Sequence, residues 1–300
     1  MTGESALPVV RYDRGVQVAG SPLWLDASTA RELCMLTTLE NKLPPLHKRV
    51  LASAPMADAL SRAGYRTHVL PVPWRRSIGV GGFQVELIDL GHELGFAHAL
   101  LESSLHRILY LGKTHHSNAL LPKAEHVVMS MPVPNPVLPG VDVDCAVREL
   151  EILMASQVRL LIEVDNIGLA AILYRRLAER GFFLNASGML GKLLLPPQVS
   201  DKVLAQLPMM RLQGRPMLRG RRLCMVETGQ GTANSTTAEH VIHVMWNLDL
   251  HAVSRILRAV SASCVWISDV PELHQEHIAH ALAPVAETRF LETRAQLSIF

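Results

Sequence analysis

The sequence has few cysteines, few aromatic residues, little net charge and no long apolar run. Only four cysteines occur in 300 residues, and no two of them form a C-x-x-C pair. This spacing disfavours a disulfide framework or a cysteine zinc site and suits a reducing cytoplasm. No apolar run approaches the ~20 residues of a membrane-spanning helix, and the N-terminus lacks a charged-then-apolar signal pattern. We therefore predict a soluble, cytoplasmic protein with no membrane partner.

Apolar residues, in contrast, are abundant. They make up 49% of the chain, which excludes a disordered protein and is enough for one large domain or two smaller ones. The net charge of +2 does not predict a surface coated by nucleic acid, but it is compatible with a local basic patch.

The most informative stretch covers residues 78–113. Apolar and polar residues alternate over 83–87, with the apolar Ile88 after them, and apolar segments follow at 97–102 and 107–111. This pattern, interrupted by glycines, predicts three short strands joined by tight turns. Between the first two strands, Gly91-His92-Glu93-Leu94-Gly95 places a histidine at a strand end, where glycine lets the backbone turn sharply.

The residues before this stretch predict short strands at 16–19, 23–25, 33–36 and 65–72. A helix is expected at 56–63 and ends at Gly64, which suits a C-terminal cap. Asp26 follows the second strand, and its simplest interpretation is a turn residue or the N-cap of a helix over 28–33.

The proline-rich segment 132–140 predicts a domain boundary. Beyond it, helices at 143–155 and 166–180 alternate with strands at 158–164 and 182–186, followed by a helix near Ser200. This alternation predicts a small α/β unit. Later strands are expected at 223–227, 240–246 and 264–267, with helices at 251–260 and near the C-terminus.

The stretch 78–113 resembles the metallo-β-lactamase-fold nucleases of the β-CASP group, above all the bacterial exonucleases associated with DNA ligase and the mRNA 3′-end processing factors. In that family a Gly-His-x-Leu-Gly turn precedes a strand, a hairpin and an "ILY-x-GD" ending. The resemblance implies an α/β fold, an αββα sandwich with an inserted α/β domain. It divides the chain into a metallo-β-lactamase-like part (1–135), a β-CASP-like insertion (136–227) and a C-terminal return (228–300).

Most of the metal ligands that the resemblance implies are replaced. At the four ligand positions of the family's His-x-His-x-Asp-His motif, this chain has Thr38, Glu40, Lys42 and Leu43. Of these, only Glu40 is a good zinc ligand. The expected vestigial site consists of Asp26, Thr38, Glu40, Lys42, Leu43, His92, Lys113, Asp249 and Leu250. Lys113 replaces an aspartate and Leu250 a histidine, while Ser268-Asp269-Val270 replaces the closing Thr-His-Gly.

Catalysis in this family needs a metal-activated hydroxide, and one histidine with one structural aspartate cannot hold the metal. We therefore expect a catalytically inactive pseudo-nuclease, without a metal or cofactor, that serves as a binding or scaffold subunit. Its expected partner is an active homologue or another nucleic-acid-processing enzyme. A second copy of the chain is a further candidate partner.

Two alternatives stay open. One is a hydrolase with a rearranged site that uses His92, Glu40 and either His115 or His116 with a single zinc or manganese ion. Adjacent side chains on an extended chain point to opposite faces, which weakens the pairing of His115 with His116.

The other alternative is direct nucleic-acid binding. Its candidate residues are Trp74, Arg75, Arg76, Arg211, Arg215, Arg219, Arg221 and Arg222, because arginines can clamp phosphates. The competing interpretations are a half-buried loop anchor for Trp74 and a solvated loop for the arginine run. On the last helix, His274, His277 and His280 are spaced so that two could share an ion, although a polar helix face is the simpler interpretation.

Overall fold

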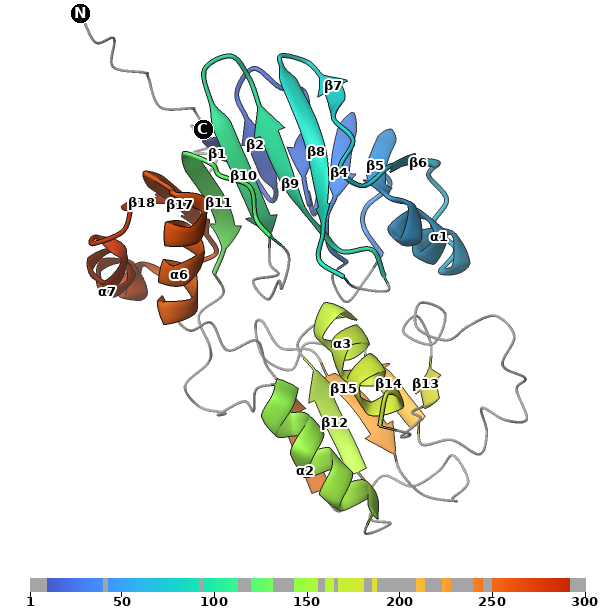
Figure 1. Ribbon diagram of the computed structural model, residues 1–300. Coiled ribbons are helices and arrows are strands. Elements are labelled where there is room, and N and C mark those ends of the chain that lie inside the picture. Colours follow the sequence, from blue (N-terminus) through green and yellow to red (C-terminus); the bar gives the residue numbers. More distant parts are fainter. Residues whose placement is uncertain are drawn as a thin grey trace, which may run out of the picture.

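The computed structural model (Figure 1) describes residues 10–39, 43–91, 94–112, 120–131, 143–155, 160–164, 167–180, 185–187, 209–213, 223–227, 240–244 and 250–291. These residues form a large two-sheet sandwich and a smaller α/β unit that lies below one edge of the sandwich in Figure 1.

The first sheet has six strands in sequential order. They are β1 (Val10–Tyr12), β2 (Val16–Val18), β3 (Trp24–Leu25), β4 (Leu33–Leu36), β5 (Arg49–Ser53) and β6 (Val69–Val72). β1, β2 and β3 pair antiparallel, whereas β3 to β6 pair parallel. The sheet is therefore mixed, and β1, β3, β4 and β5 all end at the same edge.

The second sheet has seven strands in the order β18-β17-β11-β10-β9-β8-β7. They are β7 (Ile78–Val80), β8 (Phe83–Asp89), β9 (Ala97–Glu102), β10 (Arg107–Gly112), β11 (His126–Ser130), β17 (Cys264–Ser268) and β18 (Glu287–Leu291). β7 to β10 form an antiparallel meander, and β10, β11, β17 and β18 are parallel.

The two sheets face each other across an apolar core because side chains alternate along each strand. Met35 of β4 and Val128 of β11 point into this core. Their neighbours point outward: Leu36 packs with α1 (Ala54–Arg62), and Met129 packs with α6 (Leu250–Val260) and α7 (Glu272–Leu282). The predicted α/β class and αββα sandwich are confirmed.

Helix α1 begins where the sequence supplies a cap. The Ser53 hydroxyl accepts a hydrogen bond from Met56 N, and Pro55 lies in the first turn. The helix ends before Gly64, whose φ of +84° suits glycine. The predicted helix is thus confirmed and starts two residues earlier than expected.

The smaller unit contains α2 (Val143–Ala155), β12 (Leu160–Val164), α3 (Ile167–Ala178), β13 (Asn185–Ser187), β14 (Met209–Gln213), β15 (Leu223–Glu227) and β16 (His240–Val244). β12 pairs with β16 in parallel, and β13, β14 and β15 form a second sheet. β16 pairs with β12 and so shares a sheet with the smaller unit. The domain boundary expected at residue 228 stays a prediction.

The smaller unit packs against the sandwich through α3. Arg175 Nη1 donates a hydrogen bond of 3.0 Å to Gly91 O. Buried residues of α2 and α3 belong to the same apolar cluster as Leu90 and Leu94, which follow β8.

Several sequence predictions are corrected. Residues 28–33 form no helix: Asp26 has a φ of +46°, and the chain continues in bends until β4 starts at Leu33. The strand predicted at 65–72 contains only β6. The stretch 78–113 contains four strands, since β7 precedes the expected three. The helix expected near Ser200 lies outside the described residues.

Candidate functional site

The strand directions bring the described site positions Asp26 and Thr38, which follow β3 and β4, to one edge of the sandwich. β3, β4, β8, β10, β11 and β17 all end there, and the smaller unit lies next to it (Figure 1). We call it the carboxyl edge. The Ala97 N–H donates to Thr37 O at 3.0 Å and ties the two sheets together there.

Asp26 is the central group of the carboxyl edge. Its Oδ1 accepts hydrogen bonds from Thr37 N at 2.7 Å and from Thr38 N at 3.3 Å. Its Oδ2 accepts from the Tyr110 hydroxyl at 3.0 Å and from the Thr37 hydroxyl. A carboxylate offers about four lone-pair positions, so these donors occupy all of them.

Burial raises the pKa of Asp26, while its hydrogen bonds with Thr37, Tyr110 and Thr38 act in the opposite direction. Burial and the nearby Asp26 carboxylate also hold the pKa of Tyr110 well above its usual range. Tyr110 is therefore a neutral hydroxyl that donates to Asp26. The arrangement holds strand ends together and leaves Asp26 no free oxygen for a metal.

Gly112 completes this arrangement at the end of β10. Its φ is +62°, and a Cβ placed there would lie 3.1 Å from Thr37 Oγ1 and 3.4 Å from Asp26 Oδ2. A side chain at this position would press on the hydrogen bonds around Asp26.

Thr38 and Leu43 lie beside Asp26 in a small hollow. Its lining is mostly apolar: Asp26, Ala27, Ser28, Leu36, Thr38, Leu39, Leu43, Pro44 and Pro45. Thr38 is 9% exposed, and Leu43 packs against the neighbouring apolar cluster. These two predicted positions are thus brought together with Asp26, in surroundings that offer no further metal ligand among the described lining residues.

The remaining predicted positions are only partly described. Glu40, Lys42, His92, Lys113 and Asp249 lie outside the described residues, as do His115 and His116. Leu250 is the first residue of α6 and packs, partly buried, against the cluster between α6 and the second sheet.

Asp269 is a residue of this edge that sequence reasoning missed as a functional group. It follows β17 with a φ of +65°. Its carboxylate accepts hydrogen bonds from Tyr12 OH at 2.7 Å, Ser130 Oγ at 2.5 Å and Ser268 Oγ at 3.3 Å. These bonds join the ends of β1, β11 and β17. The available signal was an aspartate directly after a buried parallel strand.

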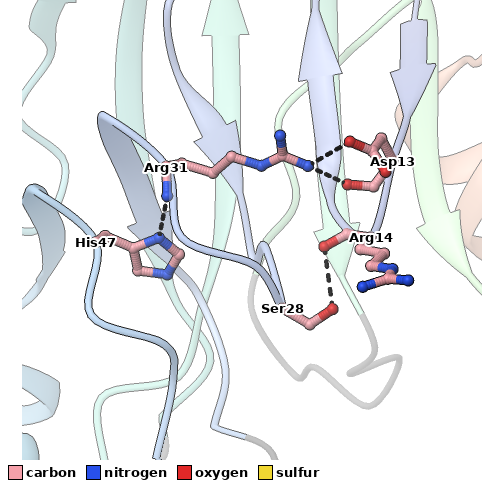
Figure 2. A network of polar contacts seen from close by, with 5 residues as sticks. All are labelled: Asp13, Arg14, Ser28, Arg31 and His47. Carbon is pink, nitrogen blue, oxygen red and sulfur yellow. Dashed lines mark hydrogen bonds and ion pairs between the residues drawn. The ribbon is translucent and has the colours of Figure 1, made fainter.

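A second polar network lies in the loops next to Asp26 (Figure 2). Arg31 Nη2 donates to Asp13 Oδ2 at 2.7 Å, and its guanidinium carbon lies 3.7 Å from the centre of the Trp24 ring. Arg31 N donates to His47 Nδ1 at 3.1 Å. Burial and the Arg31 charge lower the pKa of His47. The ring is therefore neutral near pH 7, as an acceptor nitrogen requires.

The predicted nucleic-acid residues are divided in the structure. Trp74 is half-buried against the core and bridges to Leu87, and Arg75 N donates to Leu87 O at 3.1 Å. This geometry favours the loop-anchor interpretation of Trp74, with Arg75 and Arg76 exposed beside it. Arg211 lies in β14, whereas Arg215, Arg219, Arg221 and Arg222 lie outside the described residues.

On α7, His277 and His280 are exposed and His274 is half-buried. Within the described ranges, one group of three metal-ligating side chains has its ligand atoms close together, and it contains no α7 histidine. This supports a polar helix face. No helix among the described residues is both long and apolar enough to cross a membrane.

No protein-family model matches the chain, and no curated protein matches it by sequence. One similar solved structure is a protein of unknown function from Enterococcus faecalis V583, with 11% identity and a TM-score of 0.49 over 87% of this chain and 79% of that chain. Another is the metallo-beta-lactamase fold protein YhfI from Bacillus subtilis, with 8% identity and a TM-score of 0.42 over 98% of this chain and 92% of that chain. Both TM-scores lie below 0.5, so neither match establishes a family or an activity.

Proposed function

We propose that this chain is a degenerate β-CASP-type member of the metallo-β-lactamase fold, a pseudo-nuclease that acts as a binding or scaffold subunit. The proposal rests on the motif order in the sequence, the αββα sandwich, and an α/β unit inserted between β11 and α6. Each is a feature of the resembled nucleases.

The observation that carries the loss of catalysis is the state of Asp26 and its neighbours. All lone-pair positions of its carboxylate accept hydrogen bonds from Thr37, Thr38 and Tyr110. The adjoining hollow presents Thr38 and Leu43 where the family has metal ligands. A catalytic zinc needs about three protein ligands and an open position for water, and the described part of this edge supplies none that is free.

The role in nucleic-acid processing comes from the resemblance alone. In some eukaryotic RNA-cleavage complexes a degenerate β-CASP subunit joins an active homologue. By analogy, the proposed partner is a nuclease with an intact His-x-His-x-Asp-His motif. The half-burial of Trp74 argues against a stacking surface for single-stranded nucleic acid at 74–76. Direct binding would then rest on the arginines.

A nuclease assay tests the loss of catalysis. End-labelled single- and double-stranded DNA and RNA are incubated with the full chain and added zinc or manganese, with His92→Ala as the matched control. We expect no cleavage above that control. Cleavage that requires the metal and disappears in His92→Ala would overturn the proposal and favour the rearranged hydrolase.

The scaffold role needs its own experiment. The chain is mixed at known concentrations with a purified active β-CASP nuclease from the same source, and complex formation is followed by analytical ultracentrifugation. A defined complex is expected. If both proteins sediment independently at concentrations up to tens of micromolar, the proposed partner class is wrong.

A further inference from the structure

Three potential metal ligands converge at the edge of the sandwich opposite the carboxyl edge. His106 ends the turn before β10, Glu125 directly precedes β11, and His126 is the first residue of β11. Each of the three offers one ligand atom, and these atoms lie within 4.8 Å of one another. We call this set the amino-edge triad, because β10 and β11 both start there.

The strand register explains why the two histidines meet. β10 and β11 are parallel neighbours, and Ile108 lies opposite His126. His106 precedes Ile108 by two residues, so it lies on the same face of the sheet as His126. The two rings stand edge to face with their centres 5.6 Å apart.

Both rings present a buried nitrogen without a partner. In the described structure, Nδ1 of His106 and Nδ1 of His126 are buried and make no hydrogen bond. The side chain of His126 is only 6% exposed, and its Nε2 lies 3.9 Å from Glu125 Oε2. Buried polar atoms normally have a partner, and leaving one unpaired costs the desolvation of that group.

The supporting turn holds His106 in place. The Ser103 hydroxyl accepts hydrogen bonds from His106 N at 3.0 Å and from Leu105 N at 3.3 Å, and Ser103 N donates to His106 O. On the other strand, the Glu125 carbonyl accepts from Ser263 N at 2.8 Å and Cys264 N at 3.2 Å. These hydrogen bonds hold the backbones of His106 and Glu125, while the Glu125 side chain is 63% exposed.

The nearby cations are directed elsewhere. Arg107 lies on the opposite face of β10 from His106, and its Nε is 3.9 Å from Glu102 Oε1. Lys123 Nζ donates to Ala259 O at 2.8 Å and Ser261 Oγ at 2.9 Å.

We propose that His106, Glu125 and His126 form a zinc site that clips the β9–β10 turn to the start of β11. Two imidazoles and one carboxylate form a ligand set that zinc accepts, with a fourth position for water. Ligand atoms around a tetrahedral zinc lie about 3.4 Å apart. Rotation of the exposed Glu125 side chain and a small turn of the His106 ring would bring the three ligand atoms from within 4.8 Å of one another to that distance.

The site is independent of the proposed loss of catalysis, because it lies at the other ends of β10 and β11. Its ligands lie at the starts of these strands, whereas Asp26 and Thr38 follow the ends of β3 and β4. Its expected role is structural. Binding should stabilise the folded chain, since a ligand that binds only the native state raises the free energy of unfolding.

The test is a zinc titration of the full chain. Protein stripped with a chelator and dialysed is titrated with zinc sulfate against a chromophoric competitor. We expect one zinc per chain, an affinity at least about tenfold weaker in His106→Gln and in Glu125→Gln, and no change in the matched control His68→Gln, which alters an exposed histidine. Zinc should also raise the melting temperature of the wild type but not of the two variants.

Several results would overturn the site. The folded wild type binding no zinc would do so, and so would unchanged zinc affinity in both variants. Because Glu125 is exposed, Glu125→Gln decides the matter if His106→Gln does not fold, as judged by circular dichroism. Zinc binding that is lost in His92→Gln instead would reject the amino-edge triad and separately contradict the pseudo-nuclease proposal.

Discussion

The two edges of the sandwich treat their polar groups in opposite ways. At the carboxyl edge, Asp26 and Asp269 have their oxygens occupied by hydroxyl and amide donors from neighbouring strand ends. At the amino edge, His106 and His126 keep buried ring nitrogens without a partner in the described structure.

This difference shows that ligand residue type alone does not make a metal site. A carboxylate that already accepts several hydrogen bonds holds the protein together and has no capacity left for an ion. A buried imidazole nitrogen without a donor or acceptor has that capacity. By this criterion, the edge where the family resemblance places the metals is the weaker candidate.

The largest expected effect comes from removing the Asp26 carboxylate. Asp26→Ala leaves the Thr37 and Thr38 N–H groups and the Tyr110 hydroxyl without their acceptor and puts alanine at a φ of +46°. We expect a loss of about 3 to 5 kcal/mol in the free energy of unfolding, measured by urea denaturation. The exposed Asp58→Ala is the control. A loss below about 1 kcal/mol would show that Asp26 does not organise this edge.

A second test adds a methyl group at the carboxyl edge. Gly112→Ala places a Cβ 3.1 Å from Thr37 Oγ1, whereas Gly91→Ala meets nothing within 4 Å at a similar positive φ. Both variants carry the backbone cost of about 1 to 2 kcal/mol, so the difference between their unfolding free energies reports the clash with Thr37. We expect Gly112→Ala to be the less stable by about 1 kcal/mol. Equal stabilities would mean that the residues around Gly112 shift to accommodate the methyl group at no measurable cost.

The two tyrosines of this edge should differ in importance. Tyr110 is 4% exposed and its hydrogen bond to Asp26 is partly buried, whereas the Tyr12 bond to Asp269 is exposed. Tyr110→Phe should therefore cost about 1.5 to 3 kcal/mol and Tyr12→Phe less than about 1 kcal/mol. Chemical denaturation of both variants checks the order. The reverse order would show that Asp269, and not Asp26, contributes more to the stability of this edge.

The smallest effect concerns pH. Because burial lowers the pKa of His47 in the folded state, the unfolded chain binds a proton more readily. Stability from this group is complete above its unfolded pKa of about 6.5 and is lost as pH falls from there through the folded pKa. His47→Gln keeps an acceptor for Arg31 N and should flatten the pH dependence of the melting temperature in this window. The control His68→Gln should leave that pH dependence unchanged. The same pH dependence of the melting temperature in wild type and His47→Gln would contradict the prediction.

The sequence predicted the long, strongly patterned elements well. β8, β9 and β10 follow the alternation and glycine turns of 78–112, and α2 and β15 have the predicted bounds. It missed β1, β5, β14 and β18. β5 is buried on both faces, so it has no period of two, and it lies after a proline-containing loop. The helix expected at 28–33 failed because tertiary contacts, among them Arg31 with Asp13 and Trp24, hold that segment in bends.

The candidate sites were harder to predict for a physical reason. The family pattern pointed to Asp26, Thr38 and Leu43, and the structure brings these three together. Asp269 and the amino-edge triad depend on pairing between strands that are distant in sequence. The proximity of His106 to His126 follows from the β10–β11 register, which no local pattern specifies.

The most direct test of the central claim is the metal content of the His106→Gln variant, purified without chelator and measured by elemental mass spectrometry. This variant removes the amino-edge site, so any metal that remains must be held elsewhere. We predict no more than traces of zinc, manganese or iron. One or two equivalents per chain would contradict the account, because the carboxyl edge would then hold metal despite its occupied Asp26.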